Sequence, residues 1–310
     1  IGDDDRPADV RAALAAGARS LLAWPDGVAD LPGELARVAA TGQPGSAGVL
    51  AGLVVATRGV QGGAGATTVA VHLAAAWARW GPAPVLLLDL AGGLAFRLDL
   101  GAAPTWSTLP PPAGTAGHHV PVEAGTGVGG LDAGTLAGAL AEPWAGLSVL
   151  PLAGLADGAP DPPPEATAVQ HVLEVARGTF QVIVVDLPAS DGPAVRTALS
   201  QADALVAVGR CETAGVRALQ AALGAWVATG RDPDAAGAVV TGVRPRAPLA
   251  PREVRAALGD RLWGLVPDAA AELAAAAEDG VLLIDRHDLS AVQAMVTLAN
   301  RVVPFAAAPA

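Results

Sequence analysis

The chain has 310 residues, 52% of them hydrophobic, and a formal net charge of -11 at pH 7. This charge argues against non-specific binding of DNA, which depends on neutralising phosphates with basic side chains. Much of the apolar content is alanine, and no run of about 18 strongly apolar residues occurs, so no transmembrane segment is expected. Cys211, the single cysteine, excludes an internal disulfide framework and fits a reducing, cytoplasmic compartment.

The first 48 residues are expected to form a small fragment and a linker. Residues 1–40 have the pattern helix, strand, helix, at 6–18, 20–24 and 31–40. Pro25 closes the strand, because proline cannot continue a hydrogen-bonded ladder. Residues 41–48 have the composition of a linker. The chain begins at Ile1 without a methionine or a secretory signal pattern, so we expect it to be part of a longer protein.

From residue 49 to 305 strands and helices alternate, which predicts an α/β domain with a doubly wound, mostly parallel sheet. The expected strands are short apolar runs at 53–56, 85–89, 147–150, 182–186, 205–208, 238–241 and 262–268. The expected helices lie at 69–80, 132–142, 169–177, 214–229, 269–279 and 289–303. Two segments rich in proline and glycine are expected to be loops, and a short tail follows the domain, at 101–130, 156–164 and 306–310.

A glycine-rich loop separates the first strand of this domain from its first helix. It reads Gln61-Gly62-Gly63-Ala64-Gly65-Ala66-Thr67-Thr68. Such a loop lets backbone N–H groups wrap a phosphate, and the helix N-terminus adds partial positive charge. The glycines allow close approach, and the hydroxyl of Thr67 is placed to bind Mg²⁺. The loop therefore predicts a site for a nucleotide phosphate and its metal ion.

Two aspartates, Asp186 and Asp89, each end a buried expected strand. Asp186 lies in Val-Val-Asp-Leu-Pro after four apolar residues, which is the pattern of a Walker B aspartate that holds Mg²⁺ through water. Asp89 ends the strand at 85–89. Open parallel sheets bind ligands at the carboxyl ends of their strands, where both residues fall. For each, the structural alternative is an aspartate that caps a helix or closes a turn.

Taken in order, the loop, Asp89 and Asp186 resemble the ParA/MinD superfamily of P-loop NTPases, and within it the CpaE/TadZ-like branch. That branch joins a degenerate receiver domain to an ATPase domain with an irregular loop. Residues 1–40 are similar to the last third of such a receiver, and an unrelated α/β edge is the alternative. The resemblance covers nearly all of the chain and rests on the stretches 16–25, 62–67, 147–150, 184–188 and 275–280.

The resemblance implies that ATP and Mg²⁺ are bound, with Gln61 to Thr68 and Pro267 around the nucleotide and Thr67 and Asp186 at the metal. Asp89 is the one candidate catalytic residue. It also implies a homodimer, protein partners in the division or secretion machinery, and a cytoplasmic protein recruited to the septum or pole.

Several residues that the family pattern requires are missing. The family loop reads Lys-Gly-Gly-x-Gly-Lys-Thr-Thr, but Gln61 and Ala66 stand at its two lysines, and the chain has no lysine at all. A charge-assisted hydrogen bond is worth roughly 1.5–3 kcal/mol, so binding of ATP is expected to weaken by about one to two orders of magnitude. Hydrolysis should suffer more, because an added cation over the transferred phosphate contributes roughly 10³–10⁵ in rate.

Two further departures concern the switch and the base. The family's first switch reads Asp-x-Asp, and Ala91 replaces the second aspartate. The asparagine that should follow the strand at 238–241 on the adenine side is absent, whereas Pro267 lies in a segment that resembles the other base-flanking turn.

The expected function is therefore a regulatory or positional ParA/MinD-like protein, with a degenerate ATP site and at most weak ATPase activity. Its role would be septum-site control or the localisation of a Tad-type pilus or secretion system. One alternative is an active partition-type ATPase with nucleotide-dependent dimerisation, in which arginines such as Arg58 replace the lysines. The other is a nucleotide-free structural pseudo-ATPase.

Four weaker signals favour structural explanations. Gly125, Gly127 and Gly130 spell G-x-G-x-x-G, but no strand precedes them. The pair His118-His119 has no further metal ligands nearby. Cys211 is expected to be a small buried residue. The apolar stripe of the helix at 289–303 is expected to pack on the domain, because Arg301 is the one basic residue of a helix that could otherwise lie on a membrane.

Overall fold

The computed structural model describes residues 52–101, 103–110, 130–152, 163–278, 282–286 and 288–304, with the side chains at 277 and 278 excepted. The chain divides into two units, Ile1–Leu50 and Ala51–Ala310. The expected receiver-like fragment, the linker and the tail lie outside the described residues, as do Gly125, Gly127 and the histidine pair.

Within the described residues eight strands form one sheet in the order β3-β4-β2-β5-β1-β6-β7-β8. They are β1 Leu53–Gly59, β2 Val85–Asp89, β3 Ala141–Trp144, β4 Leu147–Leu150, β5 Val182–Leu187, β6 Ala204–Arg210, β7 Ala236–Val243 and β8 Leu262–Pro267. Neighbouring strands are parallel, except that β3 pairs antiparallel with β4. The central strands read as continuous apolar runs because helices bury both of their faces. The predicted doubly wound fold is confirmed.

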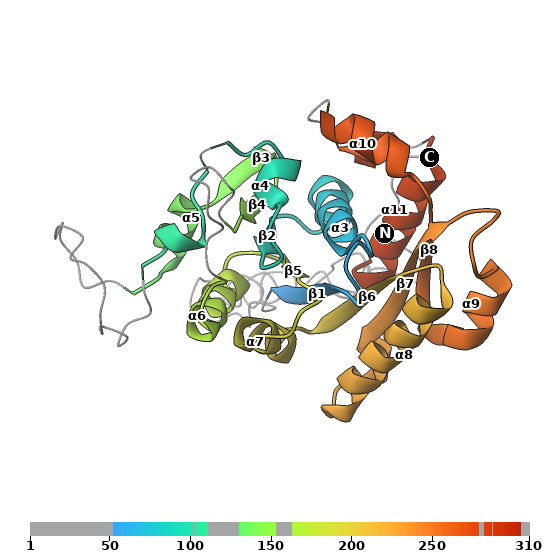
Figure 1. Ribbon diagram of the computed structural model, residues 1–310. Coiled ribbons are helices and arrows are strands. Elements are labelled where there is room, and N and C mark those ends of the chain that lie inside the picture. Colours follow the sequence, from blue (N-terminus) through green and yellow to red (C-terminus); the bar gives the residue numbers. More distant parts are fainter. Residues whose placement is uncertain are drawn as a thin grey trace, which may run out of the picture. The chain divides into compact units, whose positions relative to one another are not determined.

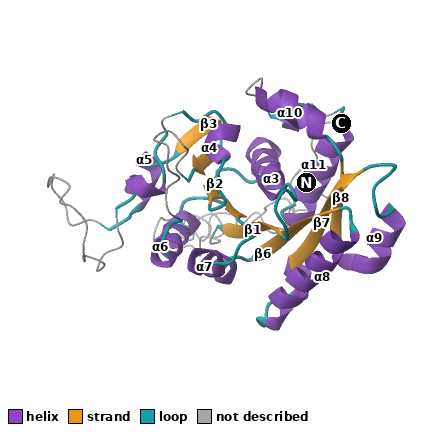
Figure 2. Cartoon of the chain, in the orientation of Figure 1, coloured by secondary structure: helices purple, strands orange, loops and turns teal. Residues whose placement is uncertain are grey.

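The α-helices lie in two layers on either side of this sheet (Figure 1). They are α3 Ala66–Trp80, α4 Leu94–Arg97, α5 Ala133–Gly138, α6 Ala166–Arg177, α7 Pro193–Gln201, α8 Thr213–Ala228, α9 Pro251–Leu258, α10 Ala270–Glu278 and α11 Ser290–Val302. Short 3₁₀ turns are η2 Trp106–Thr108, η4 Pro233–Ala235, η5 Gly259–Arg261 and η6 Leu283–Asp285. Figure 2 shows the strands gathered between the helical layers.

Each face of the sheet has its own apolar core, because successive side chains of a strand point to opposite faces. On one face Val55 and Val184 pack with α3, α10 and α11. On the other, Val54 and Ile183 pack with α6, α7, α8 and α9. The indole N–H of Trp77 donates to the carbonyl of Ala299 at 3.1 Å and so joins α3 to α11. Because side chains alternate between the two faces along each strand, only every second residue lies on the face that carries α3 and the loop.

The last helix packs on the domain, as expected. In α11 the side chains of Val292, Met295 and Leu298 are each no more than 2% exposed. No helix in the described parts of the chain is long and apolar enough to cross a membrane.

The structure differs from the expected elements in a few places. The predicted helix 132–142 ends at Gly138, and the following residues form β3, which turns back through Gly146 at φ +82° to pair with β4. Helix α3 begins three residues before the predicted start, at Ala66. Helices α4, α7 and α9 were not predicted.

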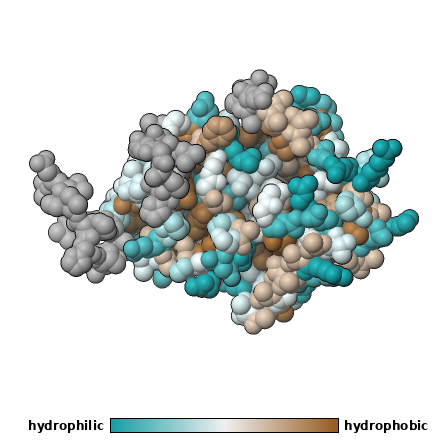
Figure 3. Space-filling view, viewed as in Figure 1, coloured by the Kyte–Doolittle hydropathy of each residue, from teal (hydrophilic) through white to brown (hydrophobic). Residues whose placement is uncertain are grey.

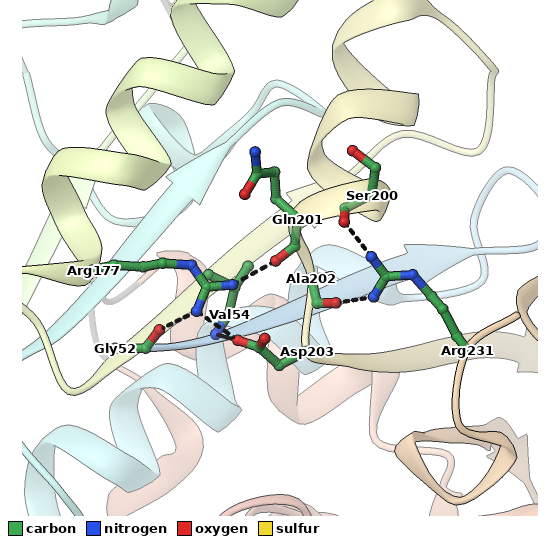
Figure 4. A network of polar contacts seen from close by, with 8 residues as sticks. All are labelled: Gly52, Val54, Arg177, Ser200, Gln201, Ala202, Asp203 and Arg231. Atoms are coloured by element: carbon green, nitrogen blue, oxygen red, sulfur yellow. Dashed lines mark hydrogen bonds and ion pairs between the residues drawn. The ribbon is translucent and has the colours of Figure 1, made fainter. Parts of the chain in front are cut away.

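Two arginines hold the carboxyl end of α7 (Figure 4). The guanidinium of Arg177 donates to the carbonyls of Gly52 and Gln201 at 2.8 and 2.6 Å and to the carboxylate of Asp203 at 2.8 Å. The guanidinium of Arg231 donates to the carbonyls of Ser200 and Ala202. Cations at a helix C-terminus satisfy its free carbonyls and complement its dipole.

We predict that Arg177→Gln lowers the free energy of unfolding by about 1.5–3 kcal/mol, because partly buried acceptors lose a charged donor. The matched control is Arg79→Gln, whose exposed ion pair with Asp285 at 3.1 Å should contribute less than about 1 kcal/mol. Urea denaturation measures both variants. Equal effects of the two substitutions would contradict the assigned role of Arg177.

Candidate functional site

The glycine-rich loop leaves β1 at Gly59 and enters α3 at Ala66. Gly63 and Gly65 adopt φ of +71° and +87°, in the left-handed region that glycine enters at least cost. Gly65 is the N-cap of α3, and no side chain caps the helix. A Cβ built on Gly62 or Gly63 would meet nothing within 4 Å. The loop thus presents uncapped backbone N–H groups beside open space, as a phosphate cradle requires.

Neighbouring strands hold this loop from one side. The hydroxyl of Thr241 on β7 donates to the carbonyl of Ala64 at 2.8 Å. Arg210 on β6 donates to the carbonyl of Gly63 at 3.4 Å. The side chain of Gln61, at the position of the family's first lysine, donates to the carboxylate of Glu212 at 2.7 Å.

Beneath the loop, three polar residues lie in register on adjacent strands. Thr57 on β1 pairs with Asp186 on β5, and Asp186 pairs with Asp89 on β2. Residues paired in this way share one face of the sheet, here the face covered by α3. All three side chains are fully buried, at 0% exposure. The register therefore places Asp89 and Asp186 side by side, although they are 97 residues apart, as the difference of their numbers shows.

Asp186 has neither of its carboxylate oxygens hydrogen-bonded among the described residues, and the same holds for the hydroxyl of Thr57. The pKa of Asp186 is raised to about 7; burial is the main cause, and the charge of Asp89 acts in the same direction. The side chain of Thr67, and after it the charge of Arg97, act to lower this pKa. A buried carboxylate without a partner is costly unless a cation joins it.

The environment of Asp89 is different. Its carboxylate accepts from the backbone N–H groups of Ala91, Gly92 and Leu94, at 3.0, 2.6 and 3.1 Å. Burial raises the pKa of Asp89, and these backbone donors, with Leu94 the strongest, lower it. These contacts are those of an aspartate that closes a turn and starts α4, which is the structural alternative raised by the sequence.

Arg58 does not reach the loop. As an even-numbered residue of β1 it lies on the face opposite α3, where it donates to the carbonyl of Ala189 at 3.1 Å and the carboxylate of Asp191 at 2.7 Å. The hypothesis that Arg58 replaces a missing lysine is therefore wrong, and strand alternation is the reason.

Arg97, which no sequence motif singles out, lies on the same face of the sheet as α3. It ends α4 and, with Thr68 and His72 of α3, lines a small cavity of about 50 Å³. Its positive charge lowers the pKa of both Asp186 and His72. Its guanidinium makes no hydrogen bond or ion pair to another described residue. The sequence does hold a signal for Arg97: it is an arginine that follows Asp89 closely in a chain that has no lysine.

His72 is buried at 3% exposure, and one ring nitrogen, Nδ1, lies 2.8 Å from the carbonyl of Thr68. Burial is the main cause that lowers the pKa of His72, so the ring is neutral at pH 7 and adds no cation to the site.

Pro267 lies at the end of β8, beside Val243 of β7. In the described residues no group of three or more His, Cys, Asp and Glu side chains could hold a metal ion.

Comparisons with known proteins show what the fold is similar to. Neither a model of a known family nor a curated protein sequence matches the chain. Among solved structures, a ParA family ATPase from Chlorobium tepidum matches with a TM-score of 0.63 and 15% identity, over 80% of this chain and 98% of that one.

Two structures of the division protein MinD match as well. The MinC:MinD complex from Aquifex aeolicus has a TM-score of 0.61 and 20% identity, over 84% of this chain and 99% of that one. MinD from Pyrococcus horikoshii, complexed with Mg-ADP, has a TM-score of 0.61 and 18% identity, over 81% and 96%. The chain therefore has the fold of the ParA/MinD ATPases.

The buried carboxylate predicts a pH-dependent stability. With the folded pKa of Asp186 at about 7 and the unfolded value at 3.8, the folded state holds this proton more tightly. Stability of the wild type should therefore fall as pH rises from about 4 to above 7. Without Mg²⁺, Asp186→Asn should gain stability relative to wild type over that window, by up to about 4 kcal/mol for a shift of three units.

Urea denaturation at pH 5 and pH 8 measures this difference. Thr57→Val is the matched control, because it removes another buried polar atom that lacks a hydrogen-bond partner among the described residues, without removing a charge, so its effect should be nearly the same at both pH values. A difference between wild type and Asp186→Asn that does not change with pH would rule out a desolvated carboxylate.

Proposed function

We propose that this chain is a positional protein that binds MgATP at the glycine-rich loop and hydrolyses it slowly or not at all. The observation that carries the proposal is the fully buried carboxylate of Asp186, which has no hydrogen-bond partner among the described residues, under a helix N-terminus that no side chain caps. Both features are costly by themselves and are satisfied together by a phosphate with its magnesium ion. Two similar structures support the same ligand class: the Pyrococcus horikoshii MinD with Mg-ADP, and a putative plasmid partition protein from Borrelia burgdorferi bound to AMPPNP, with a TM-score of 0.56 and 14% identity.

In this proposal the backbone N–H groups of residues 62–68 hold the phosphates. Thr67 and Asp186 hold Mg²⁺, which would neutralise charge on the phosphates. Pro267 flanks the base. Asp89 orients the turn before α4 through its three backbone hydrogen bonds. Ala91 stands in place of the second switch aspartate, which in the resembling family helps to orient the attacking water, and its loss favours binding over turnover.

Arg97 is the cation that we assign to the nucleotide in place of the missing lysine. It adjoins Thr68 in the same cavity, its charge reaches Asp186, and among the described residues no carboxylate is paired with it. Arginine suits this task because its planar fork binds phosphate oxygens in pairs.

The biological role that we propose is septum-site control or localisation of a Tad-type pilus or secretion system. It rests on the resemblance to the CpaE/TadZ-like branch, and within it to the actinobacterial septum-site-determining (Ssd) or CpaE-like proteins. We further propose a homodimer with protein partners, in a cytoplasmic protein recruited to the septum or pole. The MinC:MinD complex, whose MinD has this fold, supports a division partner.

Calorimetric titration with ATP tests the binding site. We expect saturable binding that requires Mg²⁺ and is lost in Asp186→Ala, with turnover well below the roughly 1 per second at the low end of ordinary enzymes. The absence of binding at millimolar ATP would contradict the proposal and favour a structural pseudo-ATPase. Rapid turnover abolished by Asp186→Ala would instead establish the active ATPase.

A double-mutant cycle tests Arg97. Ala66→Lys should raise the affinity for MgATP about 10- to 100-fold, and Arg97→Gln should lower it by a similar factor, since each changes one charge-assisted contact. In the Ala66→Lys background the effect of Arg97→Gln should shrink, because the two cations serve the same phosphates. Arg79→Gln, at the far end of α3, is the matched control. Additive effects of the two substitutions would exclude Arg97 as the substitute.

A further inference from the structure

A second cavity lies between α7 and α8, on the face of the sheet opposite the glycine-rich loop. Its volume is about 690 Å³. Pockets that bind small molecules usually measure about 300–1,000 Å³. Leu205 and Ala207 of β6 lie among its walls, and both belong to the core on the face away from α3. We refer to this space as the α7–α8 cavity.

The sequence of α8 explains why the cavity is open. Ala218, Ala222 and Ala225 all line it, and their spacings of four and three residues place them on one face of the helix. On the opposite side the cavity is lined by Leu199 of α7. Alanine side chains are too short to fill the distance between two helices, so the wall is apolar but the interior is not filled.

Arginines gather at the α7–α8 cavity, although the whole chain is acidic. Arg58, Arg196 and Arg231 line it together with one acidic residue, Asp191. The surplus of positive charge is local, in a chain of net charge -11. An apolar wall combined with a cationic edge is complementary to a molecule that has an apolar body and an anionic end.

Two of these arginines are already engaged. Arg58 pairs with Asp191 at 2.7 Å. Arg231 holds the end of α7, as Figure 4 shows, and its guanidinium lies 4.5 Å from the ring centroid of Trp226. Arg196 is exposed, and its guanidinium has no hydrogen bond or ion pair to another described residue. One guanidinium is thus free to bind an anion at the edge of the cavity.

We propose that the α7–α8 cavity binds a small amphipathic carboxylate, with its hydrocarbon body against the alanines of α8 and Trp226 and its carboxylate on Arg196. The volume favours a small molecule over a helix of a protein partner, because two turns of a helix about 10 Å across would need roughly 850 Å³. In the view of Figure 3 the surface mixes apolar and polar residues instead of presenting one broad apolar face.

The experiment uses the full chain and two probes of equal chain length, decanoate and decanol. Calorimetry should show saturable binding of one decanoate per chain, and decanol should bind about 10-fold more weakly or worse, since it cannot form the charged contact. Arg196→Gln should reduce this preference for the acid to less than about threefold. Arg217→Gln, also on α8 but outside the cavity lining, is the matched control and should leave both affinities unchanged.

A substitution that fills the α7–α8 cavity locates the ligand. Ala222→Leu should abolish binding of decanoate while the midpoint of urea denaturation stays unchanged or rises, because the added side chain enters an existing space. If Ala222→Leu does not fold, Ala218→Leu is used in the same way. Binding that persists in a folded filled variant, an acid preference that survives Arg196→Gln, or no saturable binding of decanoate would each overturn the proposal.

Discussion

The proposed nucleotide site depends on a single row of polar side chains across parallel strands. Thr57, Asp186 and Asp89 lie in register on β1, β5 and β2, at full burial, under the helix that follows the glycine-rich loop. Parallel strands end at one edge of the sheet, so three distant segments deliver their polar residues to one place. The helical layer over this row removes water from it, and burial is what raises the pKa of Asp186.

The two carboxylates of this row are equally buried but differ in their hydrogen bonds. Asp89 accepts three backbone hydrogen bonds and is satisfied within its own turn, so it shapes the start of α4. Asp186 accepts no hydrogen bond in the described part of the chain, so a bound cation would stabilise its carboxylate. The difference follows from the residues that come next in the chain. After Asp89 a glycine-rich turn brings backbone N–H groups back to its carboxylate, whereas after Asp186 strand β5 continues for one more residue.

Compared with the ParA/MinD loop pattern, the loop of this chain keeps the backbone groups that could bind a phosphate and lacks the charged side chains. Gly63, Gly65 and the uncapped start of α3 preserve the backbone cradle. Gln61 and Ala66 remove the two lysines, and Gln61 is turned toward Glu212. Arg97 lies on the side of the sheet where a replacement charge is useful, and Arg58 lies on the other side. The α7–α8 cavity also belongs to that other side, so the two proposed sites occupy separate cores of one sheet.

The order of the main strands and helices, the doubly wound fold, the glycine-rich loop, Asp89 and Asp186 could all be predicted from the sequence. These follow from local features: apolar runs, glycine spacing and the residues at strand ends. Only the folded chain shows that Asp89 is hydrogen-bonded while Asp186 has no partner among the described residues, and that Arg97, not Arg58, lies on the side of the loop. The cavity beside three alanines of α8 is also visible only in the folded chain. The direction and the hydrogen-bond partners of a side chain depend on strand register and helix packing, which no single stretch of sequence contains.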